Sequence, residues 1–570
     1  MQIKEKNNVV VDDDSYHLGD FFLDYMNQPT EDHIWQIDAG TGEIESKLSV
    51  KSRSIRLAKC LRNAGLGPGD VIVVSGWNHL DVHIPFYAAF MNGHPLAGVD
   101  PLYEFEEVKQ LFDTIKPKLA FCEVERLKDF DRAAKEVGLS MKLVTFHGDD
   151  DYSYDQFIKD YDDQTPEEEF KAATFDTNKI YAWLISTSGT TGRPKVAAFK
   201  HQDCLKILRL NKVLWEKTPK PGLTLSSVHW ISSYLVSLSS ITANHIKLQT
   251  SSPITLDHAI DIINKYKPIA STGTPALFAG IIKHPKYCDL TCFNKIVVYG
   301  YSIDEATLNL MKSRMREDAN VWNMFGQTEC IGPVFLPAPH GPVGNVGKDL
   351  ELVTTQIVDP DTGLVISEPN KTGELWTKGP RFAEYYNNPE ATAQAFSADG
   401  WYKTGDLFYK DENGYHFFVD RMSGYFRYQN IYVMPMEIER LLRGHPGVLD
   451  VCVLGVPDPV DGKRAAAVIM RAPGSEVSEQ EIKGLVADKL AYYKHLHGGV
   501  IFVNEFPKTV TGKIARAKVK DMVLNMLKIG EKTPVTNTGN VKKLINNFQQ
   551  ISVPVDSRHV PARAQLHASK

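Results

Sequence analysis

The stretch between Leu184 and Val196, LISTSGTTGRPKV, joins an apolar run to a glycine-rich turn that ends on one lysine. A strand that enters such a turn leaves several backbone N–H groups pointing at one spot, and loops of this kind bind phosphate. The candidate phosphate-binding residues are Ser186, Thr187, Ser188, Gly189, Thr190, Thr191, Gly192 and Lys195. The Walker A pattern G-x-x-x-x-G-K-[ST] does not fit this stretch. The alternative is a surface turn rich in small residues.

STSGTTGRPK resembles the signature loop of the adenylate-forming superfamily, which includes acyl- and aryl-CoA synthetases and insect luciferases. Four further stretches match the family's motifs in the family's order, and together they cover nearly the whole chain. Within the family the glycine-rich loop is a mobile clamp on the β- and γ-phosphates of ATP. The resemblance therefore implies the same role for this loop, with Lys195 among the catalytic residues.

The second matching stretch is FGQTE, which comprises Phe325, Gly326, Gln327, Thr328 and Glu329. It resembles the family segment Y-G-x-T-E, which implies ATP binding by the first four residues and places Thr328 and Glu329 among the catalytic residues. The resemblance implies that the aromatic ring stacks on adenine, that the threonine contacts the α-phosphate and that the glutamate helps to hold Mg²⁺. A carboxylate oxygen suits a hard cation that bridges phosphates. Read alone, the pentapeptide is an ordinary strand-to-turn sequence.

Two further motifs follow FGQTE in the family's order. YKTGD contains Asp406, which the resemblance implies accepts both ribose hydroxyls; a carboxylate can accept two strong hydrogen bonds from a vicinal diol. The pair Asp420-Arg421 resembles the hinge of the small domain, with Arg421 touching ribose or phosphate. Without that context, Thr-Gly-Asp is a turn and Asp-Arg is a surface ion pair.

The last motif is PKTVTGK, residues 507–513. The resemblance implies that Lys513 swings into the site and binds the substrate carboxylate and the α-phosphate. A compact ammonium on a flexible stem suits such a point-charge role. An isolated lysine would instead be taken for a solvated loop residue.

The chain departs from the family pattern near the start of the small domain. The family loop K-x-x-G is replaced in FRYQNIYV by Arg427 at the lysine and Asn430 at the glycine, with Gln429 where a small polar residue is usual. Asparagine tolerates left-handed backbone angles, so the turn is expected to survive. Its bulk in a narrow passage puts thioester formation in doubt.

The acyl pocket departs from the pattern as well. The family stretch G-G-A-P, which lines the acyl and adenine pocket, is matched by Tyr299, Gly300, Tyr301 and Ser302. The resemblance implies that Gly300 is an ATP-binding residue, and the two tyrosines would fill space that a bulky acid normally occupies. The segment that contains His229 and Trp230 matches the region beside the acyl group, where Trp230 is either a gate or a core residue. A milder departure is Val196, which follows Lys195 where the family usually has glycine.

These motifs lead to an expected function with open alternatives. The resemblance implies an acid-thiol ligase of the 4-coumarate-CoA ligase and luciferase-like branch, in which ATP and Mg²⁺ convert a carboxylic acid to an acyl-adenylate and coenzyme A then takes the acyl group. The alternatives are an adenylating enzyme that has lost CoA transfer, a luciferase-type monooxygenase, and a non-catalytic nucleotide-binding relative.

The elements that must position these motifs form an α/β protein. Helical stretches alternate with short β-branched runs such as VIVVS (71–75) and KLAFCEV (118–124), a pattern typical of mainly parallel sheets. After Gly341 shorter strands and Gly/Asn/Asp turns predict a β-rich subdomain. We predict a large N-terminal adenylation domain (1–420), a small mobile α+β domain (421–530) and a poorly ordered polar tail (531–570).

Composition and the chain ends limit the expected partners and location of the protein. The 570 residues carry 64 basic and 70 acidic side chains, and a net charge of -6 argues against nucleic acid as a partner. The seven cysteines lack the paired spacing of a zinc site. Neither a secretory signal nor a membrane span is predicted. We expect a cytoplasmic location; the alternative is peroxisomal, although the chain ends Ala568-Ser569-Lys570 without the leucine of the usual signal.

Overall fold

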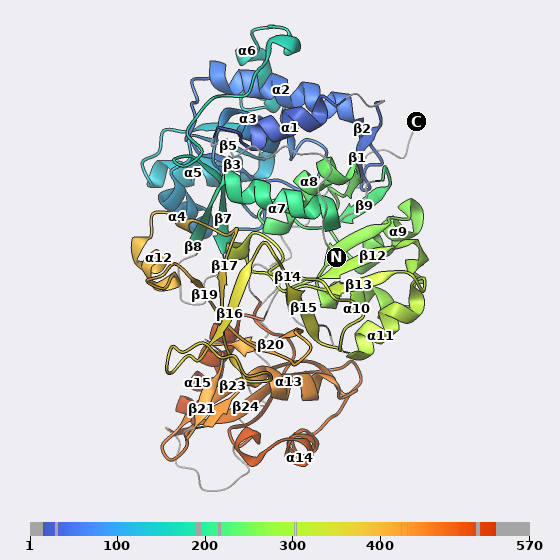
Figure 1. Cartoon of the computed structure of the whole chain (residues 1–570), viewed down its shortest axis with the longest axis vertical. Helices are drawn as coiled ribbons and strands as arrows, with labels where there is room; N and C mark the ends of the chain where they lie inside the picture. The colour runs from blue at the N-terminus through green and yellow to red at the C-terminus, as the bar shows by residue number, and fades with distance from the viewer. Residues whose placement is uncertain are drawn as a thin grey trace. The chain divides into compact units, whose positions relative to one another are not determined.

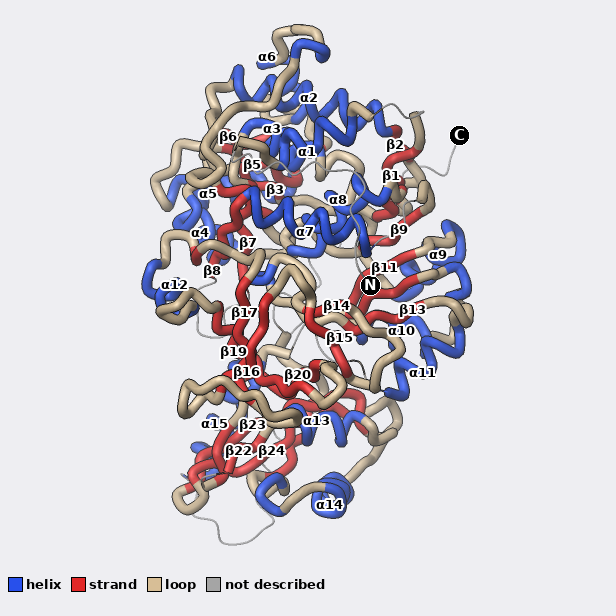
Figure 2. The backbone as a smooth tube through the Cα atoms, viewed as in Figure 1, coloured by secondary structure: helices blue, strands red, loops and turns tan. Residues whose placement is uncertain are grey.

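The computed structural model describes residues 15–28, 32–187, 195–214, 218–300, 303, 305–422, 424–429, 431–508 and 514–531. The chain divides into two compact units, one up to Gly444 and one from His445 onward (Figure 1). The predicted α/β class is confirmed, with helices and strands alternating through the first unit (Figure 2). The predicted pivot at Asp420-Arg421 stays a prediction, and the tail from residue 532 lies outside the described residues.

The first sheet of the large unit has seven strands in the order β18-β8-β7-β4-β3-β5-β6, of which β7-β4-β3-β5-β6 run parallel. The strands are β3 (Ile72–Val74), β4 (Leu96–Gly98), β5 (Leu119–Glu123), β6 (Lys142–Phe146), β7 (Tyr181–Thr187), β8 (Lys195–Lys200) and β18 (Glu384–Tyr385). Both VIVVS and KLAFCEV form strands here, as predicted.

Helices cover both faces of this sheet, because successive strand residues point to opposite sides. Ile72 and Val74 join the core that also contains residues of α2 and α3, whereas Val73 joins the core formed with α4 and α5. The helices around this sheet are α1 (Leu18–Met26), α2 (Lys47–Asn63), α3 (Ile84–Asn92), α4 (Phe105–Ile115), α5 (Leu127–Glu136) and α6 (Tyr154–Tyr161). This two-sided burial explains the short, wholly apolar strand runs in the sequence.

The second sheet of the large unit has the order β13-β12-β11-β9-β10-β1-β2 and is parallel except at β2. Its strands are β1 (Ile34–Asp38), β2 (Ile44–Ser46), β9 (Pro221–Thr224), β10 (Ile246–Gln249), β11 (Ala270–Gly273), β12 (Lys295–Val298) and β13 (Asn320–Asn323). A separate core joins it to α9 (Leu256–Tyr266), α10 (Pro275–Lys283) and α11 (Glu305–Arg314). Two further helices precede α9 in the chain, α7 (His201–Leu214) and α8 (Ile231–Ala243).

The β-rich part predicted after Gly341 is a six-stranded sheet in the order β14-β15-β20-β19-β17-β16, with every described pairing antiparallel. Its strands are β14 (Phe335–Leu336), β15 (Asn345–Asp349), β16 (Thr354–Val358), β17 (Gly373–Lys378), β19 (Tyr402–Lys410) and β20 (His416–Arg421). The short helix α12 (Pro389–Ala395) precedes β19, and β21 (Phe426–Tyr428), β22 (Ile431–Val433) and α13 (Pro435–Arg443) end this unit.

The small unit is an α+β module, as the sequence predicts. Its strands β23 (Val448–Asp458) and β24 (Gly462–Arg471) pair antiparallel, and β25 (Gly499–Val503) runs parallel to β24. Its helices are α14 (Glu479–Lys489), which begins at a capping box on Ser478, and α15 (Arg516–Glu531). Among the described residues, no helix has both the length and the apolar character needed to span a bilayer.

Gly98, the last residue of β4, packs closely against the segment before α8. A Cβ atom at this position would lie 2.2 Å from the carbonyl oxygen of Val228, a backbone atom that cannot move aside alone. The Gly98 N–H also donates to the buried Tyr234 hydroxyl at 2.6 Å. The chain therefore needs glycine here to bring the end of β4 against Val228 and His229.

We predict that Gly98→Ala lowers the free energy of unfolding by about 1–3 kcal/mol, because the added methyl overpacks a site bounded by backbone. Thermal or urea unfolding of the full chain measures the change. Gly67→Ala is the matched control, since a Cβ at Gly67 meets no atom within 4 Å. Equal stability of the two variants would contradict the close approach.

Candidate active site

Several motif residues of the large unit follow the carboxyl ends of parallel strands, whereas Asp406 and Arg421 lie on the antiparallel strands β19 and β20. Tyr299 follows β12, Phe325 follows β13, and His229 follows β9. In open parallel sheets, ligands bind beyond these strand ends. The carboxyl edge of the second sheet therefore gathers residues that are far apart in sequence, which explains why these motifs are dispersed along the chain.

The glycine-rich stretch connects two antiparallel neighbours, β7 and β8, with Thr187 opposite Lys195. Ser186 and Thr187 end β7 and are half-buried. Five predicted phosphate-binding residues, Ser188, Gly189, Thr190, Thr191 and Gly192, lie outside the described residues. The structure thus places the two ends of the loop.

Lys195 begins β8, and its ammonium lies 4.8 Å from the centre of the Tyr385 ring. A cation over an aromatic face is held without being neutralised. The next residue, Val196, is 2 % exposed and packs in the apolar core formed with α4 and α5. Val196 thus occupies a buried strand position, where a β-branched residue is favoured over the glycine that the family usually has.

A hydrogen-bond network joins the FGQTE and YKTGD motifs. Gln327 is buried, and its amide donates to the Thr404 carbonyl at 2.9 Å and to a carboxylate oxygen of Asp406. The Tyr402 hydroxyl donates to the amide oxygen of Gln327 at 2.8 Å. Because every polar atom of the Gln327 amide is used, its orientation is fixed, and it holds Asp406 in place.

Asp406 is 1 % exposed and lies opposite Arg421 on the neighbouring strand. The Arg421 Nε atom lies 3.0 Å from Oδ1 of Asp406, but within the described part of the chain this oxygen accepts no hydrogen bond. Burial raises the pKa of Asp406 to about 6, against the lowering effects of Arg421 and Gln327. A buried carboxylate oxygen with a free acceptor position is what a sugar hydroxyl would need.

Glu329 and Thr328 lie in a short 3-10 turn directly after Gln327. The Tyr385 hydroxyl donates to Oε1 of Glu329 at 2.8 Å, and the Glu329 carbonyl accepts from Phe382 N at 2.8 Å. Tyr385 thus orients the carboxylate that the resemblance assigns to Mg²⁺ while its ring faces Lys195. The oxygen-ligand character of Glu329 fits a hard cation.

Phe325 is half-buried against an aromatic cluster. Its ring lies edge-on to Phe408 at 4.7 Å between centroids and is stacked toward Phe418 at 6.3 Å. Gly326, the next residue, is exposed. The cluster fixes the ring that the resemblance assigns to adenine stacking.

His229 lies in a buried polar group at the end of β9. Its Nε2 atom lies 3.2 Å from Oδ2 of Asp100, and its Nδ1 atom lies 3.2 Å from the Ser227 hydroxyl. Burial lowers the pKa of His229 to about 3 and raises the pKa of Asp100. The imidazole is therefore neutral at physiological pH. Trp230 is half-buried with its ring 4.8 Å from that of His229, so it is not a fully buried core residue.

Tyr299 is half-buried, and its hydroxyl lies 3.0 Å from Ser226 Oγ and donates to Ser232 Oγ at 3.4 Å. Gly300 has a left-handed φ of +97°, which glycine adopts without strain. Tyr301 lies outside the described residues. Tyr299 is therefore anchored toward α8, beside the segment that carries His229.

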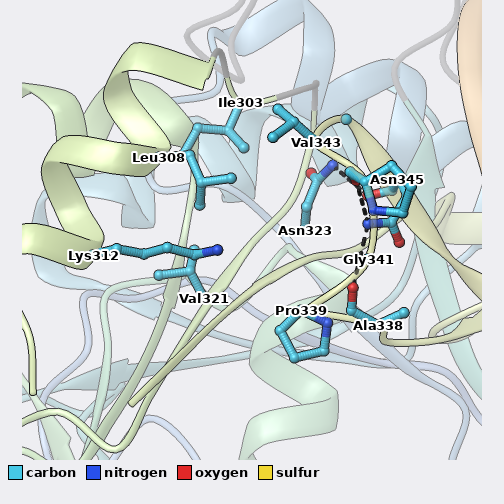
Figure 3. A pocket seen from close by; sticks show the side chains of 12 residues that line it. Ile303, Leu308, Lys312, Val321, Asn323, Ala338, Pro339, Gly341, Val343 and Asn345 are labelled. Carbon is cyan, nitrogen blue, oxygen red and sulfur yellow. Dashed lines mark hydrogen bonds between the residues drawn. The ribbon is translucent and has the colours of Figure 1, made fainter. Parts of the chain in front are cut away.

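Figure 3 shows a pocket between α11 and the loop that leads into β15, lined among others by Lys312, Asn323 and Asn345. The Asn345 side chain donates to the Pro342 carbonyl at 2.7 Å, and Asn323 donates to the Asn345 carbonyl at 3.0 Å. None of the predicted site residues lines this pocket. It borders β13 and is not where the motifs meet.

The motifs that the sequence assigns to the small domain are described only in part. Gln429, in the turn between β21 and β22, is exposed and has a left-handed φ of +52°. A left-handed residue thus occurs in this turn, at the position before Asn430. Asn430 and Lys513 both lie outside the described residues.

Sequence reasoning missed several residues that organise the site. Tyr385 follows no motif and is recognised only by its contacts with Lys195 and Glu329. Asp100 is separated from His229 by more than a hundred positions, so no spacing rule links them. Tyr402 lies within the YKTGD motif, but its contact with Gln327 depends on the pairing of β17 and β19.

Comparison with known proteins agrees with this arrangement. Residues 45–387 match the model of the AMP-binding enzyme family, and residues 437–513 match the model of the AMP-binding enzyme C-terminal domain. The chain is 28% identical to luciferin 4-monooxygenase of Photinus pyralis over 493 residues, which cover 84% of this chain and 89% of that enzyme. It is 30% identical to 4-coumarate--CoA ligase-like 4 of Oryza sativa subsp. japonica over 470 residues, covering 80% and 83%.

The fold is shared with the ATP-bound crystal structure of MatB from Rhodopseudomonas palustris, at a TM-score of 0.79 and 22% sequence identity, covering 88% of this chain and 98% of that one. The family match spans both the part that carries the glycine-rich loop, FGQTE and β12 and the part that ends at Lys513. The chain belongs to the AMP-binding enzymes of the adenylate-forming superfamily.

Proposed function

We propose that this enzyme activates a carboxylic acid with ATP to give an acyl-adenylate and then transfers the acyl group to coenzyme A. The observation that carries the proposal is the buried Asp406 carboxylate, held by Gln327 with one acceptor position free. Such a group suits a ribose diol, because a carboxylate accepts strong hydrogen bonds from two adjacent hydroxyls.

In the first half-reaction, an oxygen of the substrate carboxylate attacks the α-phosphorus of ATP. The bond from that phosphorus to the bridging oxygen breaks, and pyrophosphate leaves. The protein's task is alignment and neutralisation of charge. We assign ribose binding to Asp406, phosphate contacts to Thr328 and the loop that ends at Lys195, and the acyl-side ammonium to Lys513.

Mg²⁺ would be held by Glu329, whose Oε2 atom is left for the ion because Tyr385 donates to Oε1. When bound, the ion neutralises phosphate charge. Tyr385 acts here as a positioning residue for Glu329, and the Tyr385 ring holds Lys195 close to the same place.

In the second half-reaction, the thiolate of coenzyme A attacks the acyl carbon, the carbon–oxygen bond to AMP breaks, and the thioester forms. A second candidate is an enzyme that forms the adenylate but does not complete this step. The strained left-handed Gln429, followed by Asn430 where the family has glycine, favours it. Thioester formation with CoA at a rate matching adenylation would exclude this candidate.

A luciferase-type oxygenase is a third candidate, favoured by the similarity to luciferin 4-monooxygenase. Tyr299, anchored by Ser226 and Ser232, occupies pocket space that a bulky luciferin would need. Light emission on adding luciferins with ATP tests it. We propose a cytoplasmic location for the enzyme in any of these roles.

Pyrophosphate exchange over a panel of short, aryl and fatty acids tests adenylation. We expect exchange with at least one acid, and a loss of about a hundredfold or more in Lys513→Ala, because removing one preorganised charge costs about 3 kcal/mol in the transition state. ATP binding should survive in this variant. Lys508→Ala, in the same motif, is the matched control. Folded protein that binds ATP but shows no pyrophosphate exchange with any acid would contradict the proposal.

If Asp406 binds the ribose, its substitution should weaken ATP binding without lowering the stability of the fold. Asp406→Asn should weaken ATP binding about 10- to 100-fold, because a charged hydrogen-bond acceptor contributes about 1.5–3 kcal/mol. The melting temperature at pH 8 should stay the same or rise, since the variant no longer buries an ionised carboxylate. Calorimetric titration and thermal unfolding measure the two effects, with the exposed Asp399→Asn as control. Unchanged affinity in Asp406→Asn would contradict the assignment.

The raised pKa of Asp406 predicts opposite pH trends for binding and folding. The pKa is about 6 in the folded protein against an ordinary 3.8, so between these values the folded state holds a proton that the unfolded state has lost. Unfolding free energy should therefore fall as pH rises through this window, while nucleotide affinity should rise as the carboxylate ionises. The measurement is the difference between the native chain and Asp406→Asn from pH 4.5 to 7.5, with adenosine as ligand. Parallel pH profiles in the two proteins would contradict the prediction.

A further inference from the structure

Two histidines and two acidic residues, none of which belongs to a motif discussed above, meet at the carboxyl edge of the first sheet. His79 and Asp81 lie in the segment between β3 and α3, Glu123 ends β5, and His147 follows β6. Because β3, β5 and β6 are parallel neighbours, their carboxyl ends bring these side chains to one place. The sequence separates them by as many as 68 positions, so no spacing pattern marks them.

Three of these side chains face one another closely. Nε2 of His147 lies 2.6 Å from Oδ2 of Asp81, and Nδ1 of His79 lies 3.8 Å from the same oxygen. One ligand atom from each residue lies within 4.8 Å of the other two. Zinc bonds of about 2.0–2.1 Å place tetrahedral ligand atoms about 3.3 Å apart. The two observed separations bracket that value, and His147, 56 % exposed, can shift to meet it.

The surroundings orient the ligands as a metal site requires. Nε2 of His79 is buried without a hydrogen bond in the described part of the chain and lies 3.4 Å from Oε1 of Glu123. The backbone N–H of Asp81 donates to Nδ1 of His79 at 3.2 Å, so the ring proton belongs on Nε2, facing the carboxylate. An ion would displace this long bond and take the Nδ1 lone pair. A histidine that ligates through one nitrogen and faces a carboxylate with the other is the usual pattern around zinc.

The local charge favours a dication. Glu45, Asp81 and Glu123 bring three negative charges, and Arg53 brings one positive charge. Arg53 contacts the other oxygen of Asp81 and lies 2.9 Å from Glu45, which leaves Oδ2 of Asp81 directed at the histidines. Glu123 also accepts from Trp77 N at 2.9 Å, so its position is fixed. With both histidines neutral, these groups carry a net charge of -2, and buried charges in proteins are either paired or coordinate a metal.

We propose that His79, Asp81 and His147 bind one Zn²⁺ ion, with Glu123 as the residue that orients His79 and water at the fourth position. Two imidazoles and one carboxylate suit Zn²⁺ and exclude the hard cations Ca²⁺ and Mg²⁺, which take oxygen ligands. This proposed zinc site shares no residue with the Mg²⁺ position at Glu329, and its ligands include nitrogen atoms as well as oxygen.

The ion ties the end of β6 to a segment that reaches the second sheet. In that segment, Asn78 donates to the Ser226 carbonyl at 3.1 Å, and the His79 carbonyl accepts from Gln249 at 2.9 Å. Ser226 is the residue whose hydroxyl lies beside Tyr299. A bound ion therefore stabilises the segment that supports one wall of the acyl pocket.

The test uses the full chain without a histidine tag, stripped with a chelator and titrated with Co²⁺ as the spectroscopic probe and then with Zn²⁺. We expect one equivalent of Co²⁺ with the visible absorption of a four- or five-coordinate site, displaced by Zn²⁺ but not by millimolar Ca²⁺ or Mg²⁺. His147→Ala should weaken Zn²⁺ affinity at least about a hundredfold, and Glu123→Gln about 10- to 100-fold. Zn²⁺ should raise the melting temperature of the native chain but not of His147→Ala.

The matched control is His340→Ala, which removes an exposed histidine outside the cluster and should leave binding unchanged. His147 is exposed, so its substitution leaves the fold intact, and the apo melting temperature verifies this. Either of two results would overturn the proposal: no saturable binding of Co²⁺ or Zn²⁺, or the same affinity in His147→Ala as in the native chain.

Discussion

A buried carboxylate needs partners, and the arrangement of the site around Asp406 follows from that requirement. Gln327 donates to it, Tyr402 orients Gln327, and Arg421 supplies the nearby charge. These contacts hold the FGQTE turn against the antiparallel sheet, so the segment after β13 and the strand β19 keep one relative position. The free energy spent on burying the charge leaves an oriented acceptor, which is what selective recognition of a diol requires.

The two parallel sheets provide the other constraint. Helices cover both faces of the first sheet, which leaves its strand ends for functional side chains, and each of the two sheets contributes its carboxyl edge. The second sheet places Tyr299, Phe325 and His229, while the first places the cluster of His79, Asp81 and His147. Gly98 allows the sheets' connecting segments to approach closely enough for Asp100 to reach His229.

Three residues that depart from the family pattern have different structural roles. Val196 is a buried strand residue, so its side chain contributes to the apolar core. Tyr299 is anchored by two serine hydroxyls, and its ring therefore has a fixed orientation. Gln429 keeps a left-handed turn without glycine, which stores strain at the place where the family brings the thiol substrate.

The sequence by itself determined the α/β class, the strands VIVVS and KLAFCEV, the β-rich part after Gly341 and the family, because hydrophobic period, turn residues and motif order are local properties of the chain. Motif order also singled out Asp406, Glu329 and Lys195. Only the tertiary structure decided that Gln327 holds Asp406, that Tyr385 joins Glu329 to Lys195, and that Asp100 faces His229. It also assembled the histidine cluster. These contacts depend on sheet order and strand register, which bring together residues that no spacing along the chain relates.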